Sequence, residues 1–221
     1  MKLYYFTFCL SHIAYTPDEN RYYGRILRNE SAYLTEYMLR ALNTEFKFDC
    51  RRINIMCCGE GYVRPKVIES DHVLLLDVLF DIKYFSMTSK EKEQYLFGLL
   101  TSSLKKICEF KKWDFSIFEK HLNNLESNGF KVDFYVESKG LCRNGDTVAK
   151  IYAEQSMKEI QFYVDFFKKR TFLKRKRIDV TTEPRSMRYN WDVNHIQWID
   201  DKTVAVYSAD KTNVVCVSMD D

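Results

Sequence analysis

The sequence predicts an α+β protein with a largely antiparallel sheet, two or three packed helices and a C-terminal β-meander. Its 221 residues include 16 Phe and 15 Tyr, but only 7 Gly and 3 Pro. Aromatic residues favour cores, pleated sheets and interfaces. Scarce Gly leaves little material for loops whose backbone approaches a phosphate closely. Helical and period-two hydrophobic patterns both occur, and the period-two pattern dominates the C-terminal part.

The first strand and the first helix are separated by a polar segment. Residues 3–9 (LYYFTFC) predict a buried strand, and residues 15–30 predict a polar connection that contains Pro17. From Ser31 onward, apolar residues recur at the spacing of one helix face: Leu34, Tyr37, Met38, Ala41 and Leu42. This pattern predicts a helix that begins at Ser31.

Two strands are predicted next, over residues 52–58 (RINIMCC) and residues 66–82. Asp77 and Asp81 lie within the second of them. In a strand, a spacing of four places both carboxylates on one face but about 13 Å apart, too far to share a metal or a proton. In a helix the two carboxylates would be neighbours and could form a pair. The alternative is that Asp77 ends the strand and Asp81 caps a turn.

Two helices follow these strands. Thr88 and Glu91 are three residues apart, as in a capping box, where each side chain accepts a backbone N–H of the other residue. The apolar face of this helix contains Leu96, Leu99, Leu100, Leu104 and Ile107. Asp114 can cap a second helix, and Gly129 suits its end because glycine accepts the left-handed conformation.

After Gly129 the hydrophobic period changes to two. Residues 132–136 alternate apolar and polar side chains, and Asn144-Gly145 is typical of tight hairpin turns. Residues 147–153 and 158–168 predict further strands.

The C-terminal segment predicts a meander. Its strands cover residues 195–199, 203–207 and 213–218, with turns at Asp200-Asp201 and at Ala209 to Lys211. We expect a single α+β domain over residues 1–221. It could be subdivided into a mixed β/α part (1–129) and a mostly β part (130–221).

Charge and cysteine content predict a cytoplasmic protein with reduced thiols. The net charge is +3, less basic than a committed nucleic-acid-binding domain. The seven cysteines are odd in number and form no CxxC pair. The apolar run Leu3 to Leu10 lacks a small-residue cleavage site after it, so a signal peptide is the less favoured interpretation. No apolar run reaches the roughly 18 residues of a membrane span.

Motifs of known catalytic and cofactor sites are absent from the sequence. The histidines His12, His72, His121 and His195 are scattered without zinc-ligand spacing, and we expect His121 on the polar side of its helix. Gly59-Glu60-Gly61 matches only the first half of a dinucleotide fingerprint. We therefore expect no metal, no cofactor and no enzymatic activity.

The strongest charge feature is the basic segment, residues 168–177 (KKRTFLKRKR), with seven basic side chains in ten residues. Its candidate contact residues are Lys168, Lys169, Arg170, Phe172, Lys174, Arg175, Lys176 and Arg177. Such a segment could contact an acidic protein surface or a phosphate backbone. The alternative is a solvated strand edge or hairpin tip, where Lys and Arg prevent pairing with other strands.

A second candidate contact is the sequence RYYGR at residues 21–25. Arg21, Tyr22, Tyr23 and Arg25 are of the types that often anchor protein interfaces. The alternative is that the two tyrosines are partly buried over the core.

The lack of enzyme motifs favours a binding protein, which needs only a rigid scaffold and a polar, aromatic face. The start MKLYYFTF, the aromatic strands, the helix TSKEKEQYLFGLLTSSLKKI and the closing hairpin HIQWIDDKTVAVYS resemble bacterial immunity proteins of polymorphic or contact-dependent growth inhibition toxin systems. This resemblance implies a cytosolic, non-enzymatic protein that binds a cognate toxin domain and blocks its site. We expect no membrane among its partners. The alternatives are a nucleic-acid-binding accessory protein that uses residues 168–177, and an enzyme whose site is assembled from scattered residues.

Overall fold

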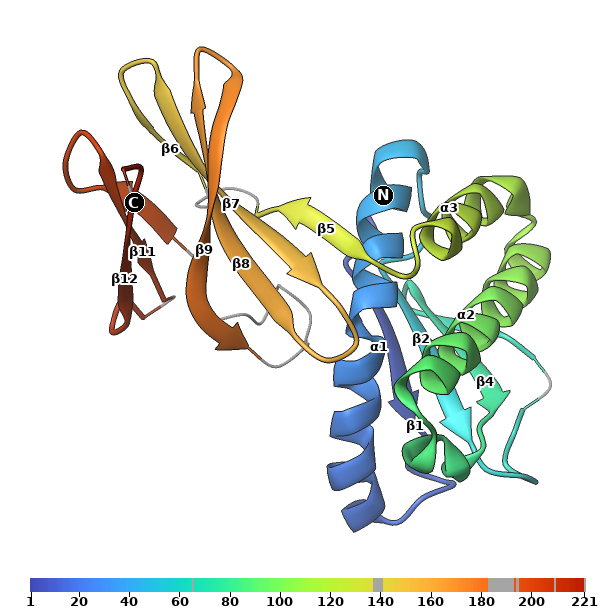
Figure 1. The fold of residues 1–221 in the computed structure, drawn as a ribbon. Helices are drawn as coiled ribbons and strands as arrows, with labels where there is room; N and C mark the ends of the chain where they lie inside the picture. Colours follow the sequence, from blue (N-terminus) through green and yellow to red (C-terminus); the bar gives the residue numbers. More distant parts are fainter. Residues whose placement is uncertain (65, 137–140, 183–192, 194, 209, 221) are drawn as a thin grey trace. The chain divides into compact units, whose positions relative to one another are not determined.

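The helices of the described chain lie in its N-terminal unit, whereas its C-terminal unit is built from strands (Figure 1). The computed structural model describes residues 1–64, 66–136, 141–182, 193, 195–208 and 210–220. The two units are Met1–Phe130 and Lys131–Asp221. The change of hydrophobic period after Gly129 falls beside this division.

The two units differ in the order of their elements. The first contains β1 (Tyr5–Leu10), α1 (Pro17–Glu45), β2 (Arg52–Cys58), β3 (Ile68–Ser70), β4 (Val73–Leu79), the 3-10 helix η1 (Ile82–Ser86), α2 (Ser89–Lys111) and α3 (Phe115–Ser127). The second contains β5 (Val132–Tyr135), β6 (Leu141–Asn144), β7 (Thr147–Gln155), β8 (Ile160–Lys168), β9 (Thr171–Thr182), β10 (His195–Trp198), β11 (Thr203–Tyr207) and β12 (Val214–Ser218). These elements confirm the predicted α+β class.

A mainly parallel sheet of order β1-β2-β4-β3 forms the centre of the first unit, and only β3 is antiparallel. A parallel pair of consecutive strands needs a crossover connection, which α1 provides between β1 and β2. On one face, the paired residues Phe6, Ile53 and Leu74 are at most 4% exposed, and α1 and α2 pack on the sheet (Figure 1). The sequence pattern did not predict this parallel pairing.

Residues 66–82 form two strands rather than the single strand that the sequence predicted. Between β3 and β4, Asp71 and His72 have φ angles of 50° and 61°, in the left-handed region where a non-glycine residue is uncommon. The chain reverses there, and β3 pairs with β4 in antiparallel register. Asp81 lies beyond β4, where its carboxylate accepts the N–H of Lys83 at 2.9 Å and caps η1.

Helix α1 begins at Pro17, so most of the predicted polar connection 15–30 is helical. Thr16 caps this helix: its hydroxyl accepts the N–H of Glu19 at 3.3 Å, and the Glu19 carboxylate accepts the Thr16 N–H at 2.8 Å. Proline suits the first helical position because its missing N–H would have no partner there. The prediction that the helix begins at Ser31 was therefore wrong.

Helix α2 confirms the predicted capping box. The Glu91 carboxylate accepts the Thr88 N–H at 2.8 Å, and the Thr88 hydroxyl accepts the Glu91 N–H at 3.4 Å. On the predicted core face, Leu96, Leu100, Leu104 and Ile107 are 0% exposed, whereas Leu99 is only partly buried. In the described ranges, no helix combines the length and the apolar character needed to cross a membrane.

Replacing Thr88 by Ala is expected to lower the free energy of unfolding by about 1 kcal/mol, because the substitution removes an N-cap acceptor. Chemical denaturation followed by the helical circular dichroism signal measures this cost. Ser102→Ala is the matched control, since Ser102 is an exposed residue within α2 and its change should stay within about 0.5 kcal/mol of the original protein. Equal costs for the two variants would contradict a capping role.

Helix α3 begins as predicted but places its histidine inside the unit. Asp114 caps it by accepting the Ser116 N–H at 2.9 Å. His121 is 7% exposed, and its Nε2 lies 3.3 Å from a Glu45 carboxylate oxygen. The expectation that His121 lies on the polar side of the helix was wrong. Gly129 follows the helix with a φ of 62°, as predicted for its end.

Two antiparallel sheets form the second unit. The larger has the order β5-β7-β8-β9, with β6 also paired to β7, and the smaller has the order β10-β11-β12. The two sheets share one hydrophobic core, to which β8 contributes Phe162 and Phe166 and the smaller sheet contributes Ile196 and Val206. The smaller sheet is the predicted meander. Ala209, in its predicted turn, lies outside the described residues.

Candidate functional site

The first part of the basic segment is an exposed hairpin tip. Lys169 and Arg170 form the two-residue turn between β8 and β9, with φ angles of 47° and 74°. Positive φ at both positions is the requirement of a type I′ hairpin turn. Lys168, Lys169 and Arg170 are all exposed, and Lys169 lies 3.5 Å from the Asp146 carboxylate. This end of the segment fits the solvated-tip interpretation and still offers positive charge to a partner.

Arg175 differs from its neighbours because it is paired with a buried carboxylate. Its Nε donates to Asp165 Oδ1 at 2.6 Å, and its Nη2 donates to Asp165 Oδ2 at 2.8 Å. The Asp165 side chain is 0% exposed. Hydrogen bonding to Asp165 raises the pKa of the Arg175 guanidinium further above its ordinary value. The positive charge of Arg175 is therefore neutralised by Asp165 within the protein.

Three tyrosines of the same sheet donate their hydroxyls to carboxylates. The pairs are Tyr135–Asp165 at 2.8 Å, Tyr163–Glu154 at 3.1 Å and Tyr152–Asp133. Burial first, and then the carboxylate, raises the pKa of each phenol, that of Tyr152 to about 12. The phenols therefore remain protonated donors at neutral pH. The Arg175 guanidinium lies 3.5 Å from the centroid of the Tyr152 ring, within range of a cation–π contact.

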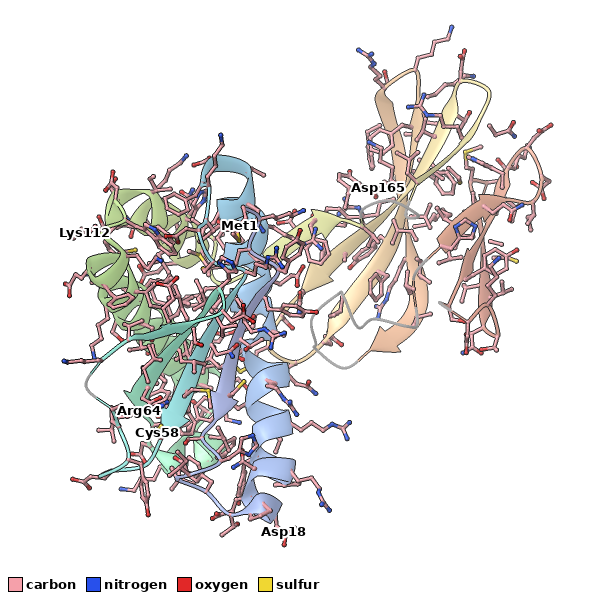
Figure 2. All side chains as sticks on the ribbon, turned by 180° about the vertical axis from the view of Figure 1, so that it is seen from behind. Met1, Asp18, Cys58, Arg64, Lys112 and Asp165 are labelled. Carbon is pink, nitrogen blue, oxygen red and sulfur yellow. The ribbon has the colours of Figure 1, made fainter. Side chains whose placement is uncertain are left out.

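Strand register brings these side chains together. Residues that pair across antiparallel strands share a face of the sheet. One row contains Tyr135, Tyr152, Tyr163 and Arg177, and the adjacent row contains Lys150, Asp165 and Arg175. We name this surface the Tyr–Arg face and define it by Asp133, Tyr135, Tyr152, Glu154, Tyr163, Asp165 and Arg175. Figure 2 shows Asp165 in the strands that form it.

Within the basic segment, Lys174 and Lys176 do not share the face of Arg175 and Arg177. Lys174 pairs with Phe166 and Lys176 pairs with Val164, two residues of the opposite, core-facing side of the sheet. Both lysines are partly buried. Phe172 is 51% exposed near the turn. Strand alternation thus divides a stretch that is continuous in the sequence between two faces.

The RYYGR residues lie on α1, where Arg25 is four residues from Arg21 and three from Tyr22, so these three side chains are neighbours on the helix surface. Arg21 lines one cavity, whereas Tyr22 and Tyr23 line another together with Phe85. The ring centroids of Tyr23 and Phe85 are 4.4 Å apart, so Tyr23 is partly packed, while Tyr22 is 66% exposed. Arg25 is exposed. Tyr23 is therefore packed within the unit, while Arg21, Tyr22 and Arg25 stay exposed.

The carboxylate pair considered from the sequence is not formed. Asp77 lies in β4, 4% exposed, and accepts hydrogen bonds from Arg64 Nε at 2.5 Å and Nη2 at 2.7 Å. Hydrogen bonding to Arg64 lowers the pKa of Asp77. Asp81 has the separate capping role in η1. Within the described ranges, no group of three or more His, Cys, Asp or Glu side chains is arranged to hold a metal ion.

Sequence reasoning found Arg175 but missed the tyrosines and carboxylates around it. Their only local signal is that Asp133, Tyr135, Tyr152, Glu154 and Tyr163 occupy the outward positions of period-two strands. Comparisons of the chain with protein-family models, with curated proteins and with solved structures found no match.

Proposed function

We propose that this chain is a non-enzymatic, cytoplasmic protein that binds another protein through the Tyr–Arg face. We further propose that it is an immunity protein whose partner is a cognate bacterial toxin domain that it neutralises. The single observation that carries the binding role is the set of three tyrosines and one arginine fixed by carboxylates on one face of a sheet. The immunity role rests on the resemblance described from the sequence.

The chemistry of this face suits a protein partner. Tyr and Arg are enriched among the residues that dominate binding energy in protein interfaces. A tyrosine supplies a large contact area with few rotatable bonds, and the carboxylate partners hold the phenols in place before binding. Tyr135 is 41% exposed, and Tyr152 and Tyr163 are partly exposed. A partner therefore meets an aromatic surface that needs little further ordering.

The same face is poorly suited to nucleic acid. Asp133, Glu154 and Asp165 offset the charge of Lys150, Arg175 and Arg177 on it. Binding to a phosphate backbone depends on positive charges that replace released counterions. The exposed turn at Lys168, Lys169 and Arg170 is the part of the basic segment that retains that capacity.

Replacing Tyr135 by Ala is expected to weaken binding of the partner at least tenfold, about 1.4 kcal/mol, because an exposed aromatic anchor is removed. The partner is the protein that co-purifies with this chain from its native cells, and titration calorimetry measures its affinity. Tyr62→Ala is the matched control, since Tyr62 is 52% exposed in the first unit and its change should leave affinity unaltered. Equal affinity of the original protein and Tyr135→Ala would contradict the proposed contact face.

Two further measurements separate the alternatives. The purified partner, produced alone in bacteria, should inhibit growth, and co-production of this chain should relieve that inhibition; a harmless partner contradicts the immunity role. A chain with Lys168, Lys169 and Arg170 all changed to Gln should keep its affinity for the protein partner. If RNA co-purifies instead, and its binding weakens both with rising salt and with these three changes, the nucleic-acid function replaces the proposed one.

A further inference from the structure

A second surface of interest is a cavity of about 420 Å³ in the first unit. It is lined by the end of β1, by the connection after it and by one side of α1. Because β1 belongs to a parallel sheet, this is the carboxyl end of a parallel strand, the position at which open α/β sheets commonly bind ligands. Its volume lies within the range of small-molecule sites.

The charged side chains that line this cavity are those of Arg21 and Arg28, and the lining also contains His12. In the described part of the chain, the lining contains no Asp or Glu. Elsewhere in this unit, cations such as Arg64, Lys92 and Lys111 are paired with carboxylates. Among the described residues, the side chains of His12, Arg21 and Arg28 have no hydrogen-bond or ion-pair partner. The cavity therefore has positive charge that the protein itself does not neutralise.

Helical spacing directs the two arginines to the same cavity. Arg21, Gly24 and Arg28 follow one another at intervals of three and four residues, so they form one stripe along α1. Two turns of helix separate the arginines, about 10 Å along the axis. Both side chains are long enough to converge on one anion above Gly24.

Gly24 leaves the space between the arginines open. It is buried in the interior of α1 and has no positive φ, so the backbone does not require glycine there. A Cβ atom at this position would meet only Asn20 Oδ1, at 3.7 Å, which is an ordinary contact. Glycine destabilises a helix interior relative to alanine. The absence of a side chain at Gly24 thus enlarges the cavity and does not stabilise the helix.

We propose that this cavity binds a small phosphorylated organic molecule. The guanidinium groups of Arg21 and Arg28 hold the phosphate oxygens, since the planar guanidinium fork matches phosphate geometry. His12 donates a further hydrogen bond from its ring. Leu10 and Tyr15, which also line the cavity, contact the organic part of the ligand. A volume of about 420 Å³ exceeds the need of a bare phosphate and accommodates such a group.

Titration calorimetry with three probes tests this site: inorganic phosphate, adenosine monophosphate and adenosine. We expect the monophosphate to bind more tightly than phosphate, and adenosine to show no binding. In a chain carrying both Arg21→Gln and Arg28→Gln, affinity for the monophosphate should fall at least tenfold while the helical circular dichroism signal is unchanged. Absence of monophosphate binding at millimolar concentration, equal affinity of this double variant, or equal binding of adenosine would each overturn the proposal.

Glycine variants provide a second test with a matched control. Gly24→Ala should weaken monophosphate binding while leaving the melting temperature equal or higher, because alanine favours a helix. Gly98→Ala makes the same change in α2, where a Cβ meets nothing within 4 Å, and should leave binding unaltered. Weaker binding in both variants, or in neither, contradicts a ligand above Gly24. The outcome is independent of the Tyr135→Ala result, since the two sites share no residue.

Discussion

Replacing Arg175 by Ala is expected to lower the free energy of unfolding by about 3–5 kcal/mol. Arg175 neutralises Asp165, whose side chain is 0% exposed, through two hydrogen bonds of 2.6 and 2.8 Å. Removing the arginine leaves the Asp165 carboxylate without its counterion, and among the described residues only the Tyr135 hydroxyl still donates to it. A buried charge without a partner is among the most destabilising changes a single substitution makes.

Denaturant unfolding followed by tryptophan fluorescence measures this cost, and the helical circular dichroism signal reports separately on the first unit, which holds the described helices. Lys168→Ala is the control, since this exposed lysine belongs to the same basic segment and its change should stay within about 0.5 kcal/mol. Adding Asp165→Asn to the Arg175→Ala chain removes the buried charge and should recover part of the lost stability. A neutral Arg175→Ala would show that the pair does not hold this sheet together.

The last four residues of the basic segment, 174–177, differ in their surroundings, because Arg175 is bound to Asp165 whereas Lys174 and Lys176 lie on the other face of the sheet. Changing all four together would alter folding and charge at the same time. Substitutions confined to Lys168, Lys169 and Arg170 change only the exposed turn.

The start of α1 was predictable from the sequence and was nevertheless missed. The capping box of Thr16 and Glu19 is the same as that of Thr88 and Glu91. Pro17 adds a proline at the first helical position. Because the residues after Pro17 are polar, hydrophobic periodicity alone indicates a connection there. A polar stretch is compatible with a helix when only a narrow stripe of it is buried. Local capping chemistry was the better guide here than hydrophobic periodicity.

The Tyr–Arg face could not be assembled from the sequence in the same way. Period-two alternation identifies which residues of one strand face outward, but it does not say which residues of another strand lie beside them. The contact of Tyr135 with Asp165 joins β5 to β8, and that of Arg175 with Asp165 joins β9 to β8. The number of basic residues in the segment therefore suggests that Arg175 carries a free charge, whereas the strand register shows that Arg175 is paired with Asp165.

Parallel pairing in the first unit was hidden for a related reason. The link between β2 and β4 contains β3, a short strand, instead of the helix that usually marks a parallel crossover. The sequence from β2 to β4 therefore looks like consecutive strands without a helix between them, a pattern that favours antiparallel pairing. Only the pairing of β2 with both β1 and β4 reveals the parallel sheet, and with it the carboxyl edge where the arginine-lined cavity lies.

Replacing Leu100 by Ala is expected to lower the free energy of unfolding by about 2–5 kcal/mol. Leu100 is 0% exposed, and Leu96 and Leu104, one turn away on either side, are equally buried. The substitution removes buried methyl groups and leaves a cavity that a well-packed core closes only in part. The loss should appear as a lower denaturation midpoint in the helical circular dichroism signal, which reports on α1, α2 and α3.

Leu79→Ala makes the same substitution at a residue of the first unit that is 58% exposed, so its cost should stay below about 1 kcal/mol. Leu99→Ala, at a partly buried position of the same helix, should fall between the two. This order follows from burial alone, because the chemical change is identical in all three variants. A cost for Leu100→Ala no larger than that for Leu79→Ala would mean that α2 does not present its Leu96–Leu104 stripe to the core.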